Sequence, residues 1–546
     1  MRSGIVRTFP LFFLVLASSE VSAQSASGSS SNYLIYALIA LAVLVFLYFV
    51  IQVADNLLAI EARQSNSDKK GVNLGLFPGV KEIFASKVPD YVGEAPVTAL
   101  RKGHNILLQG EAAHTIEAAS GVRTYAVQPP NFRGILPIPK VVVETGQSVK
   151  AGDELFYDKL QPEIKYVAPV SGEIIAINRG EKRAITEVVI LADKTVDYRS
   201  LTAPDLQTCT REELVGFLMG SGAWPVLRQR PFDVLAEPNL VPRDIFISTF
   251  DTAPLAPDLN FVVEGKGPLF QKGLDVLAKL TSGAVHLGLD ARGTQAPSAV
   301  FTEAEGVQKH WFSGKHPAGN VGVQIHHISP IHANDKVWTL NVQDVILIGA
   351  LFAEGRYNAS RVVALTGAEL QTPKYVQTYI GANMGELLSG NLKEGNNRLI
   401  SGDVLSGMKK TAAEFLNFYD DQVTVVEEGD YYEMFGWLLP LSLRPSVSKT
   451  FPNFLFPGYK FHANTNTHGE KRAFVVTGQY EDVLPMDIFP QHLFKAIIVN
   501  DIERMEGLGI YEVTEEDVAL CEFVCTSKQP LQAILREGLD TMREEG

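Results

Sequence analysis

Cysteine is scarce in this sequence of 546 residues, which contains only Cys209, Cys521 and Cys525. So few thiols exclude a disulfide framework and fit a reducing compartment. An iron–sulfur cluster normally takes four thiolates, and no CxxC spacing occurs here. A zinc site would need further ligands from elsewhere in the chain. We therefore interpret Cys521 and Cys525, which lie four residues apart, as a pair of buried small apolar residues on one face of a helix.

An excess of positive charge is also missing, since the formal net charge is -14 at pH 7. Nucleic-acid binding needs clustered Lys and Arg to displace counterions from phosphates, and the sequence has no basic stripe. Long low-complexity tracts are absent too, and 46% hydrophobic with 20% charged residues is typical of packed domains. Because 546 residues exceed what one hydrophobic core supports, we expect several domains and no nucleic-acid partner.

The common catalytic signatures are missing: there is no HExxH, no GxSxG, no Walker-type loop and no dinucleotide-binding glycine fingerprint. The glycine-rich segment GSGAWPV, residues 220–226, comes nearest to a phosphate-binding loop. It places the bulky Trp224 and Pro225 where backbone amides would have to approach a ligand. As a nucleotide signature it is weak, and the sequence predicts no catalytic residue.

The N-terminal region has two apolar segments. Residues 1–23 look like a signal segment, with two arginines, a short apolar run and small residues at the end. Residues 32–54, NYLIYALIALAVLVFLYFVIQVA, carry no charge and have about the length that a bilayer core of ~30 Å requires of a helix. Basic residues follow at Arg63, Lys69 and Lys70, which places the bulk of the chain in the cytoplasm. We predict one N-terminal transmembrane helix over 32–54, followed by a linker over 55–100.

Short β-branched runs with glycine turns fill residues 101–200 and predict a small all-β module. Its two halves, ETGQSVKAGDEL and APVSGEIIAINRGEKR, resemble the barrel-sandwich of biotinyl and lipoyl carrier domains. That resemblance raises the hypothesis that Lys159 carries a lipoyl or biotinyl group. The segment from Phe156 to Tyr166 reads as a longer excursion than the tight hairpin of a carrier lysine, so a structural module with Lys159 on a solvated loop is favoured.

Helical and strand patterns alternate over residues 201–340, which favours a layered, Rossmann-like α/β domain with a largely parallel sheet. Thr210 is the expected N-cap of a helix, and DIFIS, NFVV and AVHLGLDA are the expected strands. Residues 341–410 predict a compact β-grasp-like unit of the kind that binds soluble ligands, and 411–510 a mixed α/β region. Helices are expected over 511–546, where Thr514 and Asp517 form a capping pair. The predicted fold class is multidomain α/β plus β.

The stretch GKHPAGNVGVQIHHISPI, residues 314–331, is unusually rich in histidine and glycine. On a strand, His326 and His327 would point to opposite faces, so they could not both hold one metal ion. Paired carboxylates are not nearby in the sequence, and a metal site is not predicted. By themselves these residues, with His316, are interpreted as core or exposed histidines between glycine turns.

Together with KGLDVLAKLTSGAVHLG, GSGAWPVLRQRPF and CTSKQPLQAILREGLDTMREEG, that stretch resembles the A subunits of the Na+-translocating NADH:quinone oxidoreductase. The resemblance runs from about Leu100 to the C-terminus, and the N-terminal anchor is a departure from the family. It implies a respiratory complex of the bacterial inner membrane that oxidises NADH, reduces quinone and exports Na+. This chain is then expected to be the large cytoplasmic subunit that docks on the membrane part, especially the B subunit.

The resemblance also implies where the cofactors lie. The complex uses NADH, FAD, FMN, riboflavin and iron–sulfur centres in other subunits, so this chain is expected to hold none and to be inactive alone. The family is similar to flavin subunits of Rnf-type and complex I-type enzymes, which hold the flavin phosphate in a glycine-rich loop. The segment GSGAWPV of this chain would correspond to that loop in altered form. A quinone contact is a further expectation, with His316, His326 and His327 as candidates. The alternative is a flavin-binding NADH dehydrogenase subunit of a Rnf-type complex.

Overall fold

The computed structural model describes residues 36–50, 54, 88–433, 443–448 and 452–545. The chain divides into two compact units, Met1–Lys87 and Val88–Gly546. In the first unit residues 36–50 form a helix with exposed side chains. The signal-like segment 1–23 and most of the expected linker lie outside the described residues.

The predicted transmembrane helix over 32–54 is not supported. No helix in the described ranges is long and apolar enough to cross a membrane. Residues 32–35 and 51–53 lie outside the described part of the chain.

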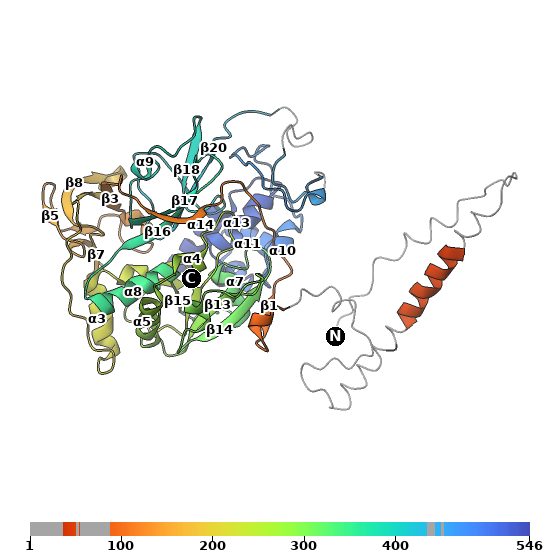
Figure 1. Ribbon diagram of the computed structural model, residues 1–546, viewed down its shortest axis with the longest axis horizontal. Helices are drawn as coiled ribbons and strands as arrows, with labels where there is room; N and C mark the ends of the chain where they lie inside the picture. Colours follow the sequence, from red (N-terminus) through yellow and green to blue (C-terminus); the bar gives the residue numbers. More distant parts are fainter. Residues whose placement is uncertain (1–35, 51–53, 55–87, 434–442, 449–451, 546) are drawn as a thin grey trace. The chain divides into compact units, whose positions relative to one another are not determined.

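The second unit contains the predicted barrel-sandwich as two small sheets, drawn in yellow and orange at one end of Figure 1. One sheet has the strand order β3 (Thr124–Val127), β9 (Ile185–Ala192), β8 (Gly172–Arg179) and β5 (Ser148–Val149). The other has the order β4 (Lys140–Val141), β6 (Glu154–Asp158) and β7 (Gln161–Val167).

Strands β6 and β7 form a tighter hairpin than expected. Asp158 pairs with Gln161, so Lys159 and Leu160 alone make the turn, and Tyr157 pairs with Lys165 further along. The expectation of a long excursion between β6 and β7 was therefore wrong. The residues on either side of the turn pair as strands β6 and β7. Lys159 is exposed at the tip of the hairpin.

A seven-stranded sheet forms the α/β layer and confirms the prediction of a largely parallel sheet. The five strands from β1 to β15 in spatial order are parallel, while β10 and β11 are added antiparallel at one edge. In spatial order the strands are β1 (Val97–Ala99), β14 (Gln308–Ser313), β13 (Val285–Asp290), β12 (Ile245–Ser248), β15 (Val337–Thr339), β10 (Arg228–Arg230) and β11 (Val234–Leu235).

Helices accompany this sheet. They are α3 (Arg211–Ser221), α4 (Leu259–Val262), α5 (Gly267–Ala278), α6 (Ala299–Thr302), α7 (Val321–Ile328) and α8 (Val342–Glu354). Thr210 caps α3 through a complete capping box, as expected. The segment NFVV, predicted as a strand, instead belongs to α4, because Asp258 accepts a hydrogen bond from Asn260 N and starts a helix.

Helices α5 and α8 lie side by side (Figure 1). A Cβ on Gly273 would come within 2.2 Å of Val345 O, and one on Gly349 within 1.8 Å of Leu269 O. The two helices therefore approach so closely that only glycine fits at their contact.

A six-stranded sheet is formed mainly by residues that follow the α/β layer in the sequence. Its order is β19 (Met408–Lys410), β18 (Asn397–Ser401), β20 (Gln422–Glu427), β16 (Ser360–Thr366), β17 (Lys374–Tyr379) and β2 (Ala113–Ala118), with the short helix α9 (Met384–Leu387) beside it. The edge strand β2 comes from before the barrel-sandwich in the sequence, as β1 does. Residues 97–118 therefore complete both large sheets, so the modules are interlocked.

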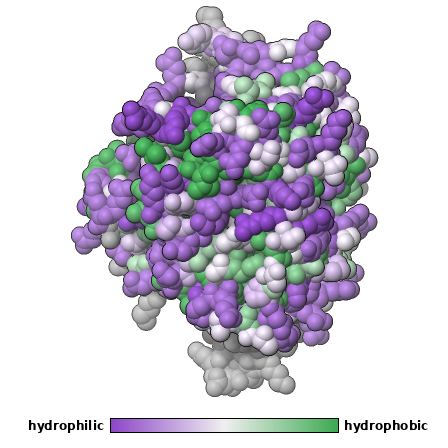
Figure 2. Space-filling view, turned by 90° about the vertical axis from the view of Figure 1, so that its left-hand side faces the viewer, coloured by the Kyte–Doolittle hydropathy of each residue, from purple (hydrophilic) through white to green (hydrophobic). Residues whose placement is uncertain are grey.

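The C-terminal helices are α10 (Gln479–Val483), α11 (Pro490–Ile498), α12 (Ile502–Gly507), α13 (Glu515–Val524) and α14 (Leu531–Glu545). The predicted capping pair of Thr514 and Asp517 is present at the start of α13. Cys521 and Cys525 are buried in the apolar core of these helices, as predicted, although Cys525 follows α13 as its C-cap. Outside these cores, the face in Figure 2 is mostly hydrophilic, with smaller apolar patches.

Candidate functional site

The histidine-rich stretch contains helix α7, which begins after Asn320. His326 and His327 therefore lie on a helix, and the expectation that they alternate across a strand was wrong. The centroids of their rings are 5.1 Å apart, and the two ring planes are nearly perpendicular. The error arises because a short run with Val and Ile fits both helical and strand periodicity.

These two histidines hold the C-terminal helical region. Asp487 N donates to His326 Nε2 at 3.0 Å, so Nδ1 carries the ring proton and donates it to Glu512 Oε2 at 2.6 Å. His327 Nε2 donates to Pro485 O at 2.8 Å. Both rings thus bind residues more than 150 positions away in the sequence.

His316 is buried in a different environment. Its Nδ1 lies 3.1 Å from the Thr252 hydroxyl, and its backbone N donates to Asn105 Oδ1 at 2.8 Å. Burial lowers the pKa of His316 to about 4, so the ring is neutral near pH 7. The structure therefore does not bring His316 together with the other two histidines at one ligand: each ring is engaged within a different packing contact.

A buried ion pair lies against the start of α7. Arg230 is 1% exposed, and its Nη1 lies 3.0 Å from Asp517 Oδ2 at the start of α13. A Cβ on Gly322 would come within 2.2 Å of that carboxylate oxygen and 2.4 Å of Arg230 Nη1. Asn320 Nδ2 donates to Glu516 O at 2.9 Å. The stretch is thus a platform on which the C-terminal helices dock, and its third glycine, Gly322, is needed for close approach.

Burial acts to lower the pKa of Arg230, but the carboxylates of Asp517 and Glu516 outweigh it, so the pKa is raised. The guanidinium remains charged, and it joins the α/β sheet to α13 through two acidic side chains.

A cavity of about 570 Å³ opens beside this platform. It lies at the carboxyl ends of the parallel strands β12 and β15, where open α/β sheets usually bind ligands. Its wall draws on the barrel-sandwich, both large sheets and the start of α13, and representative side chains are Asn131, Arg133, Ser248, Thr339, Asp403, Asp420, Thr514 and Glu515.

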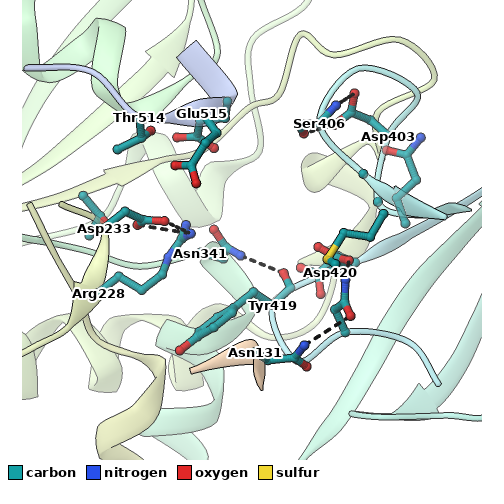
Figure 3. Close-up of a pocket in the computed structure, with 18 of the residues that line it drawn as sticks. Asn131, Arg228, Asp233, Asn341, Asp403, Ser406, Tyr419, Asp420, Thr514 and Glu515 are labelled. Atoms are coloured by element: carbon teal, nitrogen blue, oxygen red, sulfur yellow. Dashed lines mark hydrogen bonds and ion pairs between the residues drawn. The ribbon is translucent and has the colours of Figure 1, made fainter. Parts of the chain in front are cut away.

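The cavity has two electrostatically different sides. Figure 3 shows Arg228 and Asp233 on one side, Asp403 and Asp420 on the other, and Tyr419 between them. Arg133 donates to Asp233 Oδ2 at 2.8 Å, and Arg228 Nη1 lies 3.4 Å from the same carboxylate. The first side therefore neutralises its own charges, whereas the second side is acidic.

The glycine-rich segment GSGAWPV does not reach the cavity wall. Trp224 is fully buried, and its Nε1 donates to Ala236 O at 2.8 Å. Its ring meets Trp338 edge-on, with centroids 5.4 Å apart, and a Cβ on Gly222 would lie 2.3 Å from Val167. The loop is filled by its own tryptophan and packs on the barrel-sandwich. This packing disfavours a flavin phosphate at the position expected from the sequence.

Sequence reasoning assigned a ligand-binding role to none of the cavity residues, although it named Thr514 as a helix cap and singled out the stretch that contains Gly319, Asn320 and Val321. They come from segments between residues 128 and 516, and no local spacing connects them. The one sequence signal was the order of strands and helices over 201–340, which predicts a ligand-binding edge without naming its side chains. Among the described residues, no group of three or more His, Cys, Asp or Glu side chains could hold a metal ion.

The fold defines a class of multidomain proteins in which a barrel-sandwich domain is joined to an α/β sheet and a second sheet. Three family descriptions match successive parts of the chain: "NqrA N-terminal barrel-sandwich hybrid domain" at 98–193, "NqrA second alpha/beta domain" at 209–357 and "NQRA C-terminal domain" at 362–412. The chain belongs to the family of A subunits of the Na(+)-translocating NADH-quinone reductase.

Relatives support that membership along nearly their whole length. The chain is 40% identical to the A subunit of this reductase from Alcanivorax borkumensis over 451 residues, which is 82% of this chain and 99% of the relative. Identity to the corresponding protein of Saccharophagus degradans is 39% over 450 residues, again 82% and 99% of the two chains. A crystal structure of an NAD+-reducing [NiFe]-hydrogenase aligns with TM-score 0.30 at 13% identity, over 43% of this chain and 52% of that one.

Proposed function

We propose that this chain is the A subunit of a bacterial membrane complex that oxidises NADH, reduces quinone and exports Na+. The observation that carries the proposal is the 38–40% identity to proteins named as that subunit, over 99% of their length. Within the complex the chain serves as a docking scaffold for other subunits, especially the membrane B subunit. The interlocked sheets and the buried ion pair of Arg230 support a rigid scaffold.

The same proposal assigns NADH, flavin and iron–sulfur chemistry to other subunits. Two features of this chain support it. Trp224 fills the glycine-rich loop, and Cys525 Sγ accepts a hydrogen bond from the Tyr480 hydroxyl at 2.8 Å within the helical core. Flavin in stoichiometric amount in the purified chain, with NADH turnover, would favour the alternative of a Rnf-type flavin subunit.

Complementation tests the proposal directly. The full chain is expressed in a bacterium from which its own copy of this subunit has been deleted, and Na+-stimulated NADH:quinone activity is measured in membrane vesicles. We expect activity to return, and the host's own subunit is the positive control. The proposal fails if this chain is present in the vesicles and the activity stays at the level of the deletion strain.

Membrane anchoring remains a proposal from the sequence. The uncharged run 32–54 with basic residues after it supports a single-pass anchor that leaves residues 88–546 on the cytoplasmic side. The test compares the full chain with a version beginning at Val88, each expressed without the other subunits. We expect only the full chain to stay in the membrane after alkaline carbonate extraction. Complete extraction of both would refute the anchor.

A quinone contact is a second candidate role for the histidine stretch. Of the three histidines, His327 is exposed and its Nδ1 has no hydrogen-bond partner among the described residues. By contrast both ring nitrogens of His326 are engaged. In the complemented vesicles, His327→Gln is expected to raise the KM for quinone and leave the KM for NADH unchanged. Unchanged quinone kinetics would remove the candidate.

A carrier role for Lys159 is kept because the β6–β7 hairpin presents this side chain at an exposed two-residue turn. An intact mass raised by one lipoyl or biotinyl group, and lost in Lys159→Arg, would support it. An unmodified mass would leave the barrel-sandwich as a structural module.

A further inference from the structure

Acidic side chains outnumber basic ones in the wall of the 570 Å³ cavity. The basic residues of the wall are Arg133, Arg228 and Lys410, whereas the acidic ones are Glu187, Asp233, Asp251, Asp403, Glu414, Asp420, Asp421, Glu515 and Glu516. The arginines are already matched, because Arg133 bridges Asp233 and Glu515, each at 2.8 Å.

The acidic side has no such match. Asp251, Asp403 and Asp420 form no ion pair with a basic side chain in the described part of the chain. Burial, together with the nearby charge of Asp403, raises the pKa of both Asp251 and Asp420, although the charge of Arg292 partly offsets this at Asp251 and the charge of Lys410 at Asp420. These carboxylates come from separate segments, since Asp251 follows β12 and the other two flank the strands β18 and β20. The group is a concentration of negative charge that the nearby cations Arg292 and Lys410 balance only in part, without forming ion pairs.

Two further wall residues point to a missing donor. Gln128 is 8% exposed and Thr339 1% exposed, and both Gln128 Oε1 and Thr339 Oγ1 lack a hydrogen-bond partner. Buried polar atoms in folded proteins almost always find a partner. Gln128 Oε1 can only accept a hydrogen bond, and the Thr339 oxygen can accept one too. The unmet demand of the wall is therefore for N–H or O–H donors.

A bare metal ion does not meet this demand. Metal ligands must converge on one point, at about 2.0–2.6 Å from the ion, and the described residues contain no such group of three. The cavity also has the volume of a small organic ligand. A ligand with several separated positive donors fits the spread of acceptors.

We propose that this cavity binds an aliphatic polyamine, whose ammonium groups pair with Asp251, Asp403 and Asp420 and whose N–H donors also meet Gln128 and Thr339. Each ammonium offers three donors and a charge on a flexible chain, which suits acceptors contributed by several modules. The ligand would connect the α/β sheet with the six-stranded sheet at their shared cavity. The cavity borders the histidine-rich stretch at Gly319, Asn320 and Val321, but the proposal involves none of its histidines and does not depend on the proposed complex.

Isothermal titration of the purified full-length chain with spermidine tests the proposal, with MgCl2 as the competitor at matched ionic strength. We expect saturable binding at a ratio of one to one, and affinity at least tenfold lower in Asp251→Asn. That substitution keeps an oxygen for the bond from Ala253 N, which Asp251 Oδ1 accepts at 2.8 Å. The matched control is Asp205→Asn, because Asp205 accepts from Gln207 N at 3.0 Å in the same kind of turn but does not line the cavity.

Thr339→Val provides an independent variant. It removes an oxygen that has no partner in the unliganded chain, so we expect an equal or higher melting temperature together with several-fold weaker spermidine binding. Three results would overturn the proposal: no saturable binding, equal weakening in Asp205→Asn and Asp251→Asn, or complete competition by Mg2+ at matched ionic strength. Equal weakening would mean attraction to the net negative surface, and complete competition would mean a metal-ion site.

Discussion

The buried pair of Arg230 and Asp517 gives the sharpest prediction about how the C-terminal helices are held. Asp517 is fully buried, caps α13 through the Thr514 backbone N at 3.0 Å, and meets Arg230 Nη1 at 3.0 Å. Asp517→Asn keeps the shape and one capping oxygen but removes the charge. Breaking a buried pair by removing one partner typically costs about 3–5 kcal/mol. Because Arg230 keeps Glu516, which is 36% exposed, we expect the lower end, about 3 kcal/mol.

Amide hydrogen exchange measures this loss of stability locally, in helices α13 and α14. If α13 and α14 undock as a unit, a loss of about 3 kcal/mol speeds exchange of their amides by about 100-fold, since ~1.4 kcal/mol is a factor of ten. Amides of the six-stranded sheet should keep their rates. The matched control is Asp540→Asn on α14, whose carboxylate is 52% exposed and pairs with Arg536 at 3.0 Å. An exposed pair of this kind contributes only about 0.3–0.5 kcal/mol.

The double variant Arg230→Met with Asp517→Leu separates the pair from its burial. Removing both charges leaves no uncompensated ion, so its loss of stability should be clearly smaller than the sum of the two single changes. The reasoning is refuted if Asp517→Asn leaves exchange of α13 and α14 at the wild-type rate, or if the two single changes simply add.

Three further predictions concern the same docking region and the tryptophan loop. His316 is neutral when folded, with a pKa of about 4 against 6.5 unfolded, so the unfolded state binds more protons as pH falls through this window. Unfolding free energy should therefore drop by up to about 3 kcal/mol between pH 6.5 and pH 4 on this account, and chemical denaturation of His316→Asn should show a shallower pH slope; equal slopes would contradict it. Gly322→Ala should lower the melting temperature, because overpacking against Asp517 costs about 1–3 kcal/mol. The control Gly216→Ala, in open space on α3, should be neutral or stabilising. Similar melting temperatures of the two variants would count against the close approach at Gly322. Trp224→Ala should cost about 3–5 kcal/mol in unfolding free energy because the indole is fully buried, and a melting temperature near wild type would mean that the loop is not filled as described.

Local chemistry made part of the fold predictable. The capping residues Thr210 and Thr514 mark helix starts correctly, because a side-chain oxygen satisfies free backbone N–H groups whatever the rest of the chain does. The strands of the parallel sheet were recognised where apolar runs are bounded by turns, as in Val285–Asp290. Short runs failed. NFVV and the segment around His326 are helical, since a few β-branched residues fit either period and tertiary packing decides.

The cavity could not be predicted for a different reason. Its side chains come from four modules, and each is ordinary in its own segment. Asp251 follows a strand and Asp403 lies in a turn, which are common places for aspartate. Their importance arises only from long-range topology, which brings them together, and from the lack of ion pairs between them and basic side chains in the described part of the chain. The same topology moved residues 97–118 out of the barrel-sandwich and into both large sheets.

That arrangement has a consequence for how the chain is made. Strand β1 begins at Val97, but its partner β14 begins at Gln308. At about 5–20 residues per second, ribosomes need roughly 10–40 s to synthesise the intervening residues. Until then β1 has no partner, and β2 waits still longer for β17 at Lys374. A nascent chain can therefore build the barrel-sandwich early, yet neither large sheet can close its edge until late in synthesis. During that time each of these two strands exposes unpaired backbone N–H and C=O groups that could pair with another chain.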